Sequence, residues 1–453
     1  MFIRKAKGRF KILSHPLQKI GTGAKHCLST CGKQFFLVQV IFILLYRLFL
    51  DIWYMAVLSP FYDYVGFSFG GLSLTYLLSW LLLVILSPFI AHLLNFSNAS
   101  SLLVSLLNLL YFIPLTSYYG CSNVDLRLFI IAVVYWALLL TAQLYIPVLQ
   151  LPPPSHQKGR TIVITLFTLF LCSFSLYLFV RYADGQFLFS ITDVYDVRTA
   201  AYEYPLPRIL SYLYSMTPSM LGCLLLFWLN RKKYFISGII CVSFLFIFSF
   251  AGKKSFLFYF FLVIVCYFFF REWMVKWLPG FFTLVPCAAI LEKVIVGSNF
   301  ITSLFLRRMM YIPVRLGTIY YEFFQTNPLN LARAGIMRYL SFKSLYSTTI
   351  PLIIGEYENS PNNNENTGLL GDLFANYPTL LGLLLLPPFL ILIFRYFDAL
   401  TSVQKAAFLF PTAFLFAYSF MSGTWSVTLL SNGFLFICPL LYILQTKKDT
   451  SRL

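Results

Sequence analysis

Long apolar segments recur along almost the whole chain, and this feature limits its fold more than any other. About 20 consecutive apolar residues are enough to cross the hydrocarbon core of a bilayer as a helix. Charged residues make up 11% of the 453 residues, whereas a soluble domain carries about 25%. The sequence therefore predicts an all-α polytopic membrane protein with about 12 transmembrane helices. The predicted spans are 35–58, 72–93, 100–118, 126–147, 161–180, 209–229, 234–251, 255–270, 278–296, 376–394, 405–421 and 425–444.

The distribution of lysine and arginine predicts the orientation of these spans. Cytoplasmic loops of membrane proteins carry an excess of both residues. Residues 1–34 form a basic tail without any acid, so both this tail and the tail 445–453 are expected in the cytoplasm. The same rule places on that side the loops that contain Lys158, Arg160, Arg231, Lys232, Lys233, Arg271, Lys276, Arg395 and Lys405.

Two long polar stretches are then predicted to be external. Residues 35–296 contain spans one to nine and include an external loop at 181–208. Residues 297–375 form a large external loop, and residues 376–444 contain the last three spans. The large loop mixes arginines with aromatic residues between 301 and 324, which is typical of amphipathic helices on a membrane surface.

Two local signals refine the prediction for the large loop. Pro313 lacks a backbone N–H, so it is expected to break or kink the helix that contains it. Asn366 or Thr367 is expected to cap a helix that starts near Gly368, because short polar side chains accept hydrogen bonds from the first turn.

Several classes of function are excluded. The net charge of +18 follows from the cytoplasmic lysines and arginines, and no nucleic-acid-binding module accompanies it, so no nucleic acid is expected as a partner. The GxSxG, Walker A and HExxH patterns are absent, and all four histidines map to the cytoplasmic side, which argues against external histidine chemistry. Only Cys121 falls in an external loop, so no disulfide framework is expected.

The loop 181–208 contains a first cluster of charges. Three carboxylates and two guanidiniums close together could provide an acid–base pair and an anion clamp. The alternative is a solvated loop whose charges pair among themselves, which contributes little. The candidate catalytic residues are Asp193, Asp196 and Glu203, and the candidate anion-binding residues are Arg198 and Arg208.

The large loop contains a second cluster, Arg307, Arg308 and Arg315. Arginines on successive helical turns can face one diphosphate, which the planar guanidinium grips through two hydrogen bonds. The alternative is that their side chains extend to the headgroup surface. The predicted external turn at Lys253 and Lys254 conflicts with the usual charge bias. Either the span count differs there, or these lysines bind an anionic ligand.

Further charged residues offer a base and an ion pair. Glu356, Glu358, Glu365 and Asp372 could supply a general base, or they form an ordinary acidic loop. Arg47 and Asp51 are four residues apart in the first predicted span, on one helix face. An internal structural ion pair is the favoured interpretation, since charges inside a membrane need a partner.

Three stretches of the chain resemble a known family. They are Arg47–Asp51 with the following Ser59-Pro60, Asp193–Arg198, and Arg308–Pro313 continuing to Asn366–Tyr377. Together with the late polar loop, these stretches resemble the bacterial oligosaccharide repeat-unit polymerases, which make O-antigen and capsule. Where relatives often carry a Ser-Arg pair, this chain has Gly252-Lys253-Lys254-Ser255.

The resemblance implies a reaction at the outer face of the bacterial cytoplasmic membrane. A glycan on undecaprenyl diphosphate would be transferred to the end sugar of another lipid-linked repeat unit. Arginines would neutralise the departing diphosphate, and one of Asp193, Asp196, Glu203 and Asp372 would deprotonate the acceptor hydroxyl. The implied partners are undecaprenyl-diphosphate-linked oligosaccharides, membrane lipid and a chain-length regulator protein. No metal, nucleotide or other cofactor is implied.

Two alternative functions stay open. An O-antigen ligase-like glycan transferase has a similar architecture, but the ligases use an external histidine. A polysaccharide flippase or transporter with twelve spans would carry polar groups at the membrane midplane and internal repeats.

Overall fold

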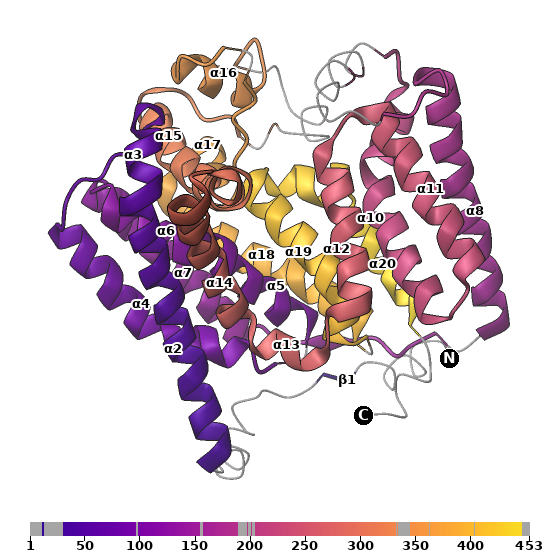
Figure 1. Ribbon diagram of the computed structural model, residues 1–453, viewed down its shortest axis with the longest axis horizontal. Helices are drawn as coiled ribbons and strands as arrows, with labels where there is room; N and C mark the ends of the chain where they lie inside the picture. The colour runs from indigo at the N-terminus through magenta and orange to yellow at the C-terminus, as the bar shows by residue number, and fades with distance from the viewer. Residues whose placement is uncertain are drawn as a thin grey trace, which may run out of the picture.

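The computed structural model consists almost entirely of helices (Figure 1). It describes residues 11–12, 30–96, 98–154, 157–188, 197, 201, 204–331, 333, 345–361, 363–402 and 404–445. In the first half of the chain, the elements are β1 (Lys11–Ile12), α2 (Thr30–Trp53), η1 (Tyr54–Leu58), α3 (Ser59–Tyr62), η2 (Asp63–Val65), α4 (Leu74–Leu93), α5 (Ala99–Leu107), η3 (Asn108–Phe112), α6 (Ile113–Cys121), α7 (Leu126–Tyr145), β2 (Leu149–Gln150), α8 (Gln157–Tyr182) and α10 (Arg208–Asn230). In the second half they are α11 (Tyr234–Ala251), α12 (Lys254–Phe269), α13 (Glu272–Lys276), α14 (Leu278–Leu291), η4 (Glu292–Val296), η5 (Thr302–Tyr311), α15 (Ile312–Thr326), α16 (Ile350–Tyr357), α17 (Leu370–Asn376), α18 (Thr379–Thr401), α19 (Ala406–Ser422), η7 (Val427–Ser431) and α20 (Phe434–Leu444).

Many of these helices are long and apolar enough to cross a membrane. Within the described residues, nine stretches meet both criteria, so the prediction of an all-α, multi-pass membrane protein is confirmed. The other three predicted spans, 255–270, 405–421 and 425–444, correspond to α12, α19 and α20, which have only 16, 17 and 11 residues.

The helices lie side by side between two opposite ends of the molecule (Figure 1). Helices α8, α10 and α11 lie on one side, α2 and α4 lie on the other, and α18 and α19 lie between them. One end carries α3, α15, α16 and α17 and is called the α16 end below. The other end carries β1 and α13 and is called the α13 end.

The helix Ala99–Cys121, formed by α5, η3 and α6, lies at the centre, and its most apolar window is completely buried. It packs against α18 and α19 near its beginning and against α2 and α4 near its end. Small polar residues let neighbouring helices approach closely and hydrogen-bond to one another. In its π-helical middle, the Asn108 amide donates to the Val104 carbonyl oxygen (2.8 Å) and accepts from Trp136 Nε1 (2.8 Å).

Helix α18 is longer than the predicted span 376–394, because two charged residues continue it instead of ending it. Arg395 Nη1 and Asp398 Oδ2 form a buried ion pair at 2.9 Å. The Asp398 carboxylate also accepts from the Ser100 backbone N–H (2.7 Å) and so caps the first turn of α5. The guanidinium donates to the Gln143 carbonyl oxygen (2.5 Å). Arg395 and Asp398 therefore connect α18 to α5 and α7.

Two expectations for the large polar segment differ from the structure. The helix does not break at Pro313, because the π-helical segment η5 runs directly into α15. Neither Asn366 nor Thr367 caps α17. Its N-cap is Leu369, and the Thr367 hydroxyl donates instead to the Pro313 carbonyl oxygen (3.0 Å). This hydrogen bond ties α17 to α15, with which it packs.

Candidate functional site

Arg315 lies at the centre of a carboxylate cluster at the α16 end. Its Nη2 forms an ion pair with Glu358 Oε2, and the two side chains are only 15% and 23% exposed. The guanidinium lies 5.8 Å from the ring centroid of Phe67. A Cβ at Gly66 would lie 2.8 Å from Arg315 Nε, and Gly66 has a φ of +82°, so both space and backbone conformation favour glycine there.

Two more glutamates complete this cluster. Burial raises the pKa of Glu322 and of Glu365, the negative charge of Glu358 raises both further, and Arg315 lowers both. Glu322 follows Arg315 by two helical turns on one face of α15, and this spacing alone is a sequence signal for their proximity, although Glu322 was not among the predicted site residues. Glu358 and Glu365 come from the segment after α15, and the tertiary fold alone brings them to Arg315. We call Arg315, Glu322, Glu358 and Glu365 the Arg315 cluster.

Asp372 occupies a separate, buried position on α17. Its Oδ2 accepts from the Trp425 backbone N–H (2.7 Å), and its Oδ1 accepts from Asn376 Nδ2 (2.6 Å). The residue is only 2% exposed, and burial raises the pKa of its carboxyl group to about 7, although both hydrogen bonds lower it. Asp372 therefore fixes the turn before η7, and in this conformation it has almost no contact with solvent.

The backbone before Asp372 is strained and tightly packed. Leu369 has a φ of +49° and a ψ of −103°, which is rare for a residue with a side chain. Gly368 donates its N–H to the Met421 carbonyl oxygen (3.0 Å), and a Cβ on Gly368 would collide with the carbonyl oxygens of Phe420 and Gly423. This contact joins α17 to the end of α19.

The three predicted arginines of the large loop do not face one point. Arg307 lies over the Tyr62 ring, with its Cζ 4.4 Å from the centroid, so it turns toward α3. Arg308 is exposed and lies within electrostatic range of Tyr418 on α19. Arg315 is engaged by Glu358, so Arg308 is the best placed of the three for an anionic ligand.

The lysine turn between α11 and α12 lies near the ends of the loop 181–208. Lys253 Nζ is 5.1 Å from the ring centroid of Tyr214, and Lys254 is exposed at the start of α12. At the same place, the Leu188 N–H donates to Ser249 Oγ (3.0 Å) and the Tyr204 ring stacks on Phe250 (5.6 Å). Both described edges of the loop therefore contact the last turn of α11.

The residues of that loop divide into two groups. Arg208 is exposed and is the first residue of α10. Asp193, Asp196, Arg198 and Glu203 lie outside the described residues.

Arg47 and Asp51 form the predicted internal ion pair, which is confirmed. Arg47 Nε and Asp51 Oδ1 are 2.6 Å apart and both side chains are buried. The carboxylate also accepts from Ser117 Oγ (2.5 Å) and Trp80 Nε1 (3.0 Å). The Cys121 thiol, predicted to lie in a loop, is buried at the end of α6 and lies 3.9 Å from the same carboxylate. These contacts join α2, α4 and α6, which indicates a structural role.

Chemically, the α16 end offers exposed cations and carboxylates whose pKa is raised by burial. Half-buried carboxylates with raised pKa can accept a proton from a hydroxyl group. Arginine and lysine can neutralise an anionic leaving group. Within the described residues, no group of three or more His, Cys, Asp and Glu side chains is arranged to hold a metal ion.

Comparisons with known proteins found no match. No family model matches the chain, and no curated protein and no solved structure matches it.

Proposed function

We propose that this protein is a membrane glycosyltransferase that joins undecaprenyl-diphosphate-linked oligosaccharide repeat units into O-antigen or capsular polysaccharide. The observation that carries the proposal is the Arg315 cluster, where glutamates with raised pKa surround an arginine at the end that also carries exposed cations. The resemblance of the sequence to repeat-unit polymerases supports the same class.

The proposal includes the topology. The α16 end faces outward from the bacterial cytoplasmic membrane, both termini are cytoplasmic, and α12, α19 and α20 complete twelve spans. Two contacts of the short helices support this count. Met421, near the end of α19, accepts from Gly368 at the α16 end (3.0 Å), and Tyr442, near the end of α20, donates to the Pro152 carbonyl oxygen after β2 (2.8 Å).

In the proposed reaction, the acceptor hydroxyl oxygen forms a bond to the anomeric carbon of the donor glycan. The bond between that carbon and the diphosphate oxygen breaks, and the lipid diphosphate leaves with the electron pair. Arg308, with Lys253, Lys254, Arg198 and Arg208, neutralises the diphosphate. The lipid-linked donor carries its own leaving group, so the reaction needs no cofactor.

The acceptor proton passes to Glu365. Its half-buried position and its raised pKa make it a stronger base than an exposed glutamate. Glu322 and Glu358 bind hydroxyl groups of the acceptor sugar. The positive charge of Arg315 offsets the electrostatic repulsion between the three glutamates. Asp372 acts as a positioning residue, because both its oxygens are occupied by Asn376 and Trp425.

A deletion strain that is complemented with variants tests the proposal. Deletion is expected to leave single repeat units and no ladder of longer glycans, and the wild-type gene restores the ladder. Glu365→Gln keeps the size of the side chain but removes the base, so it should reduce polymer about 10²–10⁴-fold at equal protein level. Glu356→Gln changes an exposed glutamate of α16 and is the matched control.

Three outcomes would contradict the proposal. Repeat units trapped inside the cell would favour a flippase. Intact ladders that are not attached to their final acceptor would favour a ligase. A normal ladder with Glu365→Gln would remove Glu365 from the mechanism.

A further inference from the structure

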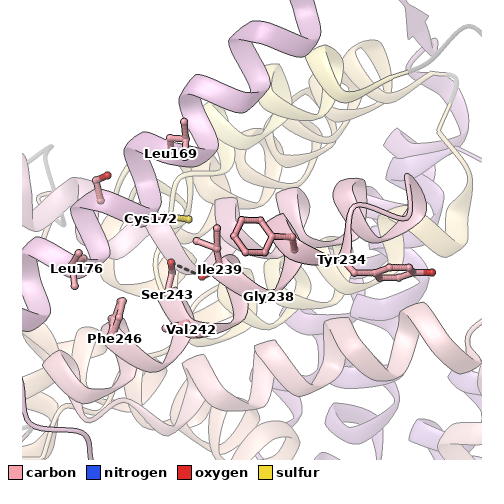
Figure 2. Close-up of a pocket in the computed structure, with 11 residues that line it drawn as sticks. Leu169, Cys172, Leu176, Tyr234, Gly238, Ile239, Val242, Ser243 and Phe246 are labelled. Carbon is pink, nitrogen blue, oxygen red and sulfur yellow. Dashed lines mark hydrogen bonds between the residues drawn. The ribbon is translucent and has the colours of Figure 1, made fainter.

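An apolar groove lies between α8 and α11 (Figure 2), on the opposite side of the molecule from α15 (Figure 1). Its volume is about 580 Å³. Leu169, Cys172 and Leu176 form the α8 wall, and Ile239 and Phe246 belong to the α11 wall (Figure 2). Both helices are apolar and long enough to span a membrane, and Leu169, Leu176 and Ile239 are 51%, 45% and 37% exposed, so this surface is expected to meet lipid.

A glycine keeps the groove open on its α11 side. A Cβ at Gly238 would have no neighbouring atom within 4 Å, so nothing in the protein fills this space. From Tyr234 to Phe246 the groove extends about 18 Å along the helix, at a rise of 1.5 Å per residue. One leaflet of a bilayer contributes about 15 Å of hydrocarbon. The groove therefore has the length of one acyl chain in one leaflet.

The groove opens beside a cluster of cations at the α13 end. Tyr234, which lines the groove, directly follows Arg231, Lys232 and Lys233 in the turn between α10 and α11. Lys232 and Lys233 are exposed. The Arg231 guanidinium lies over the Phe227 ring at 4.3 Å, which keeps its charge near this turn. Basic residues at this level of a membrane protein bind anionic headgroups.

We infer that the groove is a binding site for an anionic phospholipid of the leaflet at the α13 end. One acyl chain lies between α8 and α11 and covers Gly238. The phosphate and the negative headgroup lie against Lys232 and Lys233. A zwitterionic lipid supplies the same chain, but its ammonium group offsets the attraction. The site thus selects by charge at the turn and by shape in the groove, and it is independent of the proposed reaction.

Native mass spectrometry of the purified protein, released from detergent with equal amounts of phosphatidylglycerol or phosphatidylcholine of the same chain length, tests this site. The wild type is expected to retain phosphatidylglycerol preferentially. Replacing both Lys232 and Lys233 by alanine should reduce its affinity for phosphatidylglycerol about 30-fold, at about fivefold for each lysine, and remove the preference. Gly238→Leu should reduce retention of both lipids, because the new side chain fills the groove.

Gly159→Leu is the matched control, since a Cβ at Gly159 on α8 also meets nothing within 4 Å but Gly159 does not line the groove. Its lipid retention should equal that of the wild type. Size-exclusion profiles verify the folding of each variant. Equal retention of the two lipids by the wild type, or unchanged retention by both the lysine and the Gly238 variants, would overturn the site. Stronger retention of undecaprenyl phosphate than of phosphatidylglycerol would reassign it to a polyprenyl lipid.

Discussion

Arg308 and Arg315 are seven residues apart in one continuous helix, yet their surroundings give them different tasks. Arg315 is held by Glu358 and lies 5.8 Å from the Phe67 ring centroid, so its charge stabilises the carboxylate cluster. Arg308 is exposed, and Tyr418 lies close to its charge. At this scale, the ion pair with Glu358 gives Arg315 a role in the fold, and exposure leaves Arg308 accessible for the ligand we propose.

Substitutions at the two arginines should therefore have different effects. Arg308→Ala is expected to lower polymer formation about 10²–10³-fold without changing thermal stability, and Arg308→Lys should recover only part, because lysine lacks the planar fork. Arg315→Ala leaves Glu358 without its partner and should lower stability by about 1–3 kcal/mol. Glycan ladders and thermal unfolding, measured for the same preparations, separate the effects. A stable Arg308→Ala variant with full activity would contradict this assignment.

Asp372 is expected to make stability depend on pH. Its pKa is raised to about 7, while that of an unfolded aspartate is about 3.9. Between these values the folded protein holds a proton that the unfolded chain has released. The free energy of unfolding therefore falls as pH rises from about 4 to about 7, by on the order of 1–4 kcal/mol.

Asp372→Asn cannot ionise and provides the comparison. The difference between the thermal midpoints of wild type and Asp372→Asn should change across this pH window and stay constant above it. Parallel curves over the whole range would show that Asp372 does not titrate there.

At the scale of elements, the contact between α17 and α19 holds α17 in place at the α16 end. It is made by backbone atoms at Gly368, with no room for a side chain. Gly368→Ala should therefore displace α17 and lower stability by about 1–3 kcal/mol. Gly238→Ala is the control in open space and should be neutral or stabilising. Equal thermal midpoints for the two alanine variants would contradict the tight contact.

The elements also show what can be predicted from the sequence. The apolar runs predicted α11, at 234–251, without error, because hydrophobic length alone defines it. The predicted end of α18 at residue 394 was wrong, because the buried partners of Arg395 and Asp398 come from helices that are distant in the sequence. Likewise, no local pattern relates Arg315 to Glu358, which is 43 residues away. Membrane spans follow from composition, whereas ion pairs between segments require the tertiary fold.

At the scale of the whole molecule, the proposed orientation can be tested at two exposed positions. A cysteine at Asn363, in the segment between α16 and α17, should react with an impermeant thiol reagent in intact spheroplasts. A cysteine at Lys405, at the opposite end of the helices, should react only after lysis. The reverse pattern would invert the topology, and with it the face on which the reaction is proposed.

The buried position of the helix Ala99–Cys121 has a consequence for biogenesis. Two of the helices that enclose it, α18 and α19, are translated more than 250 residues later. Until then, Ser100 lacks its hydrogen bonds to Asp398, and the face of the helix that packs against α18 and α19 is uncovered. A chain whose synthesis stops before Thr379 therefore lacks Asp398 beside Ser100 and the helices that cover one face of α5. We expect such a chain to be degraded faster than the full-length protein, because polar groups without partners are costly in hydrocarbon.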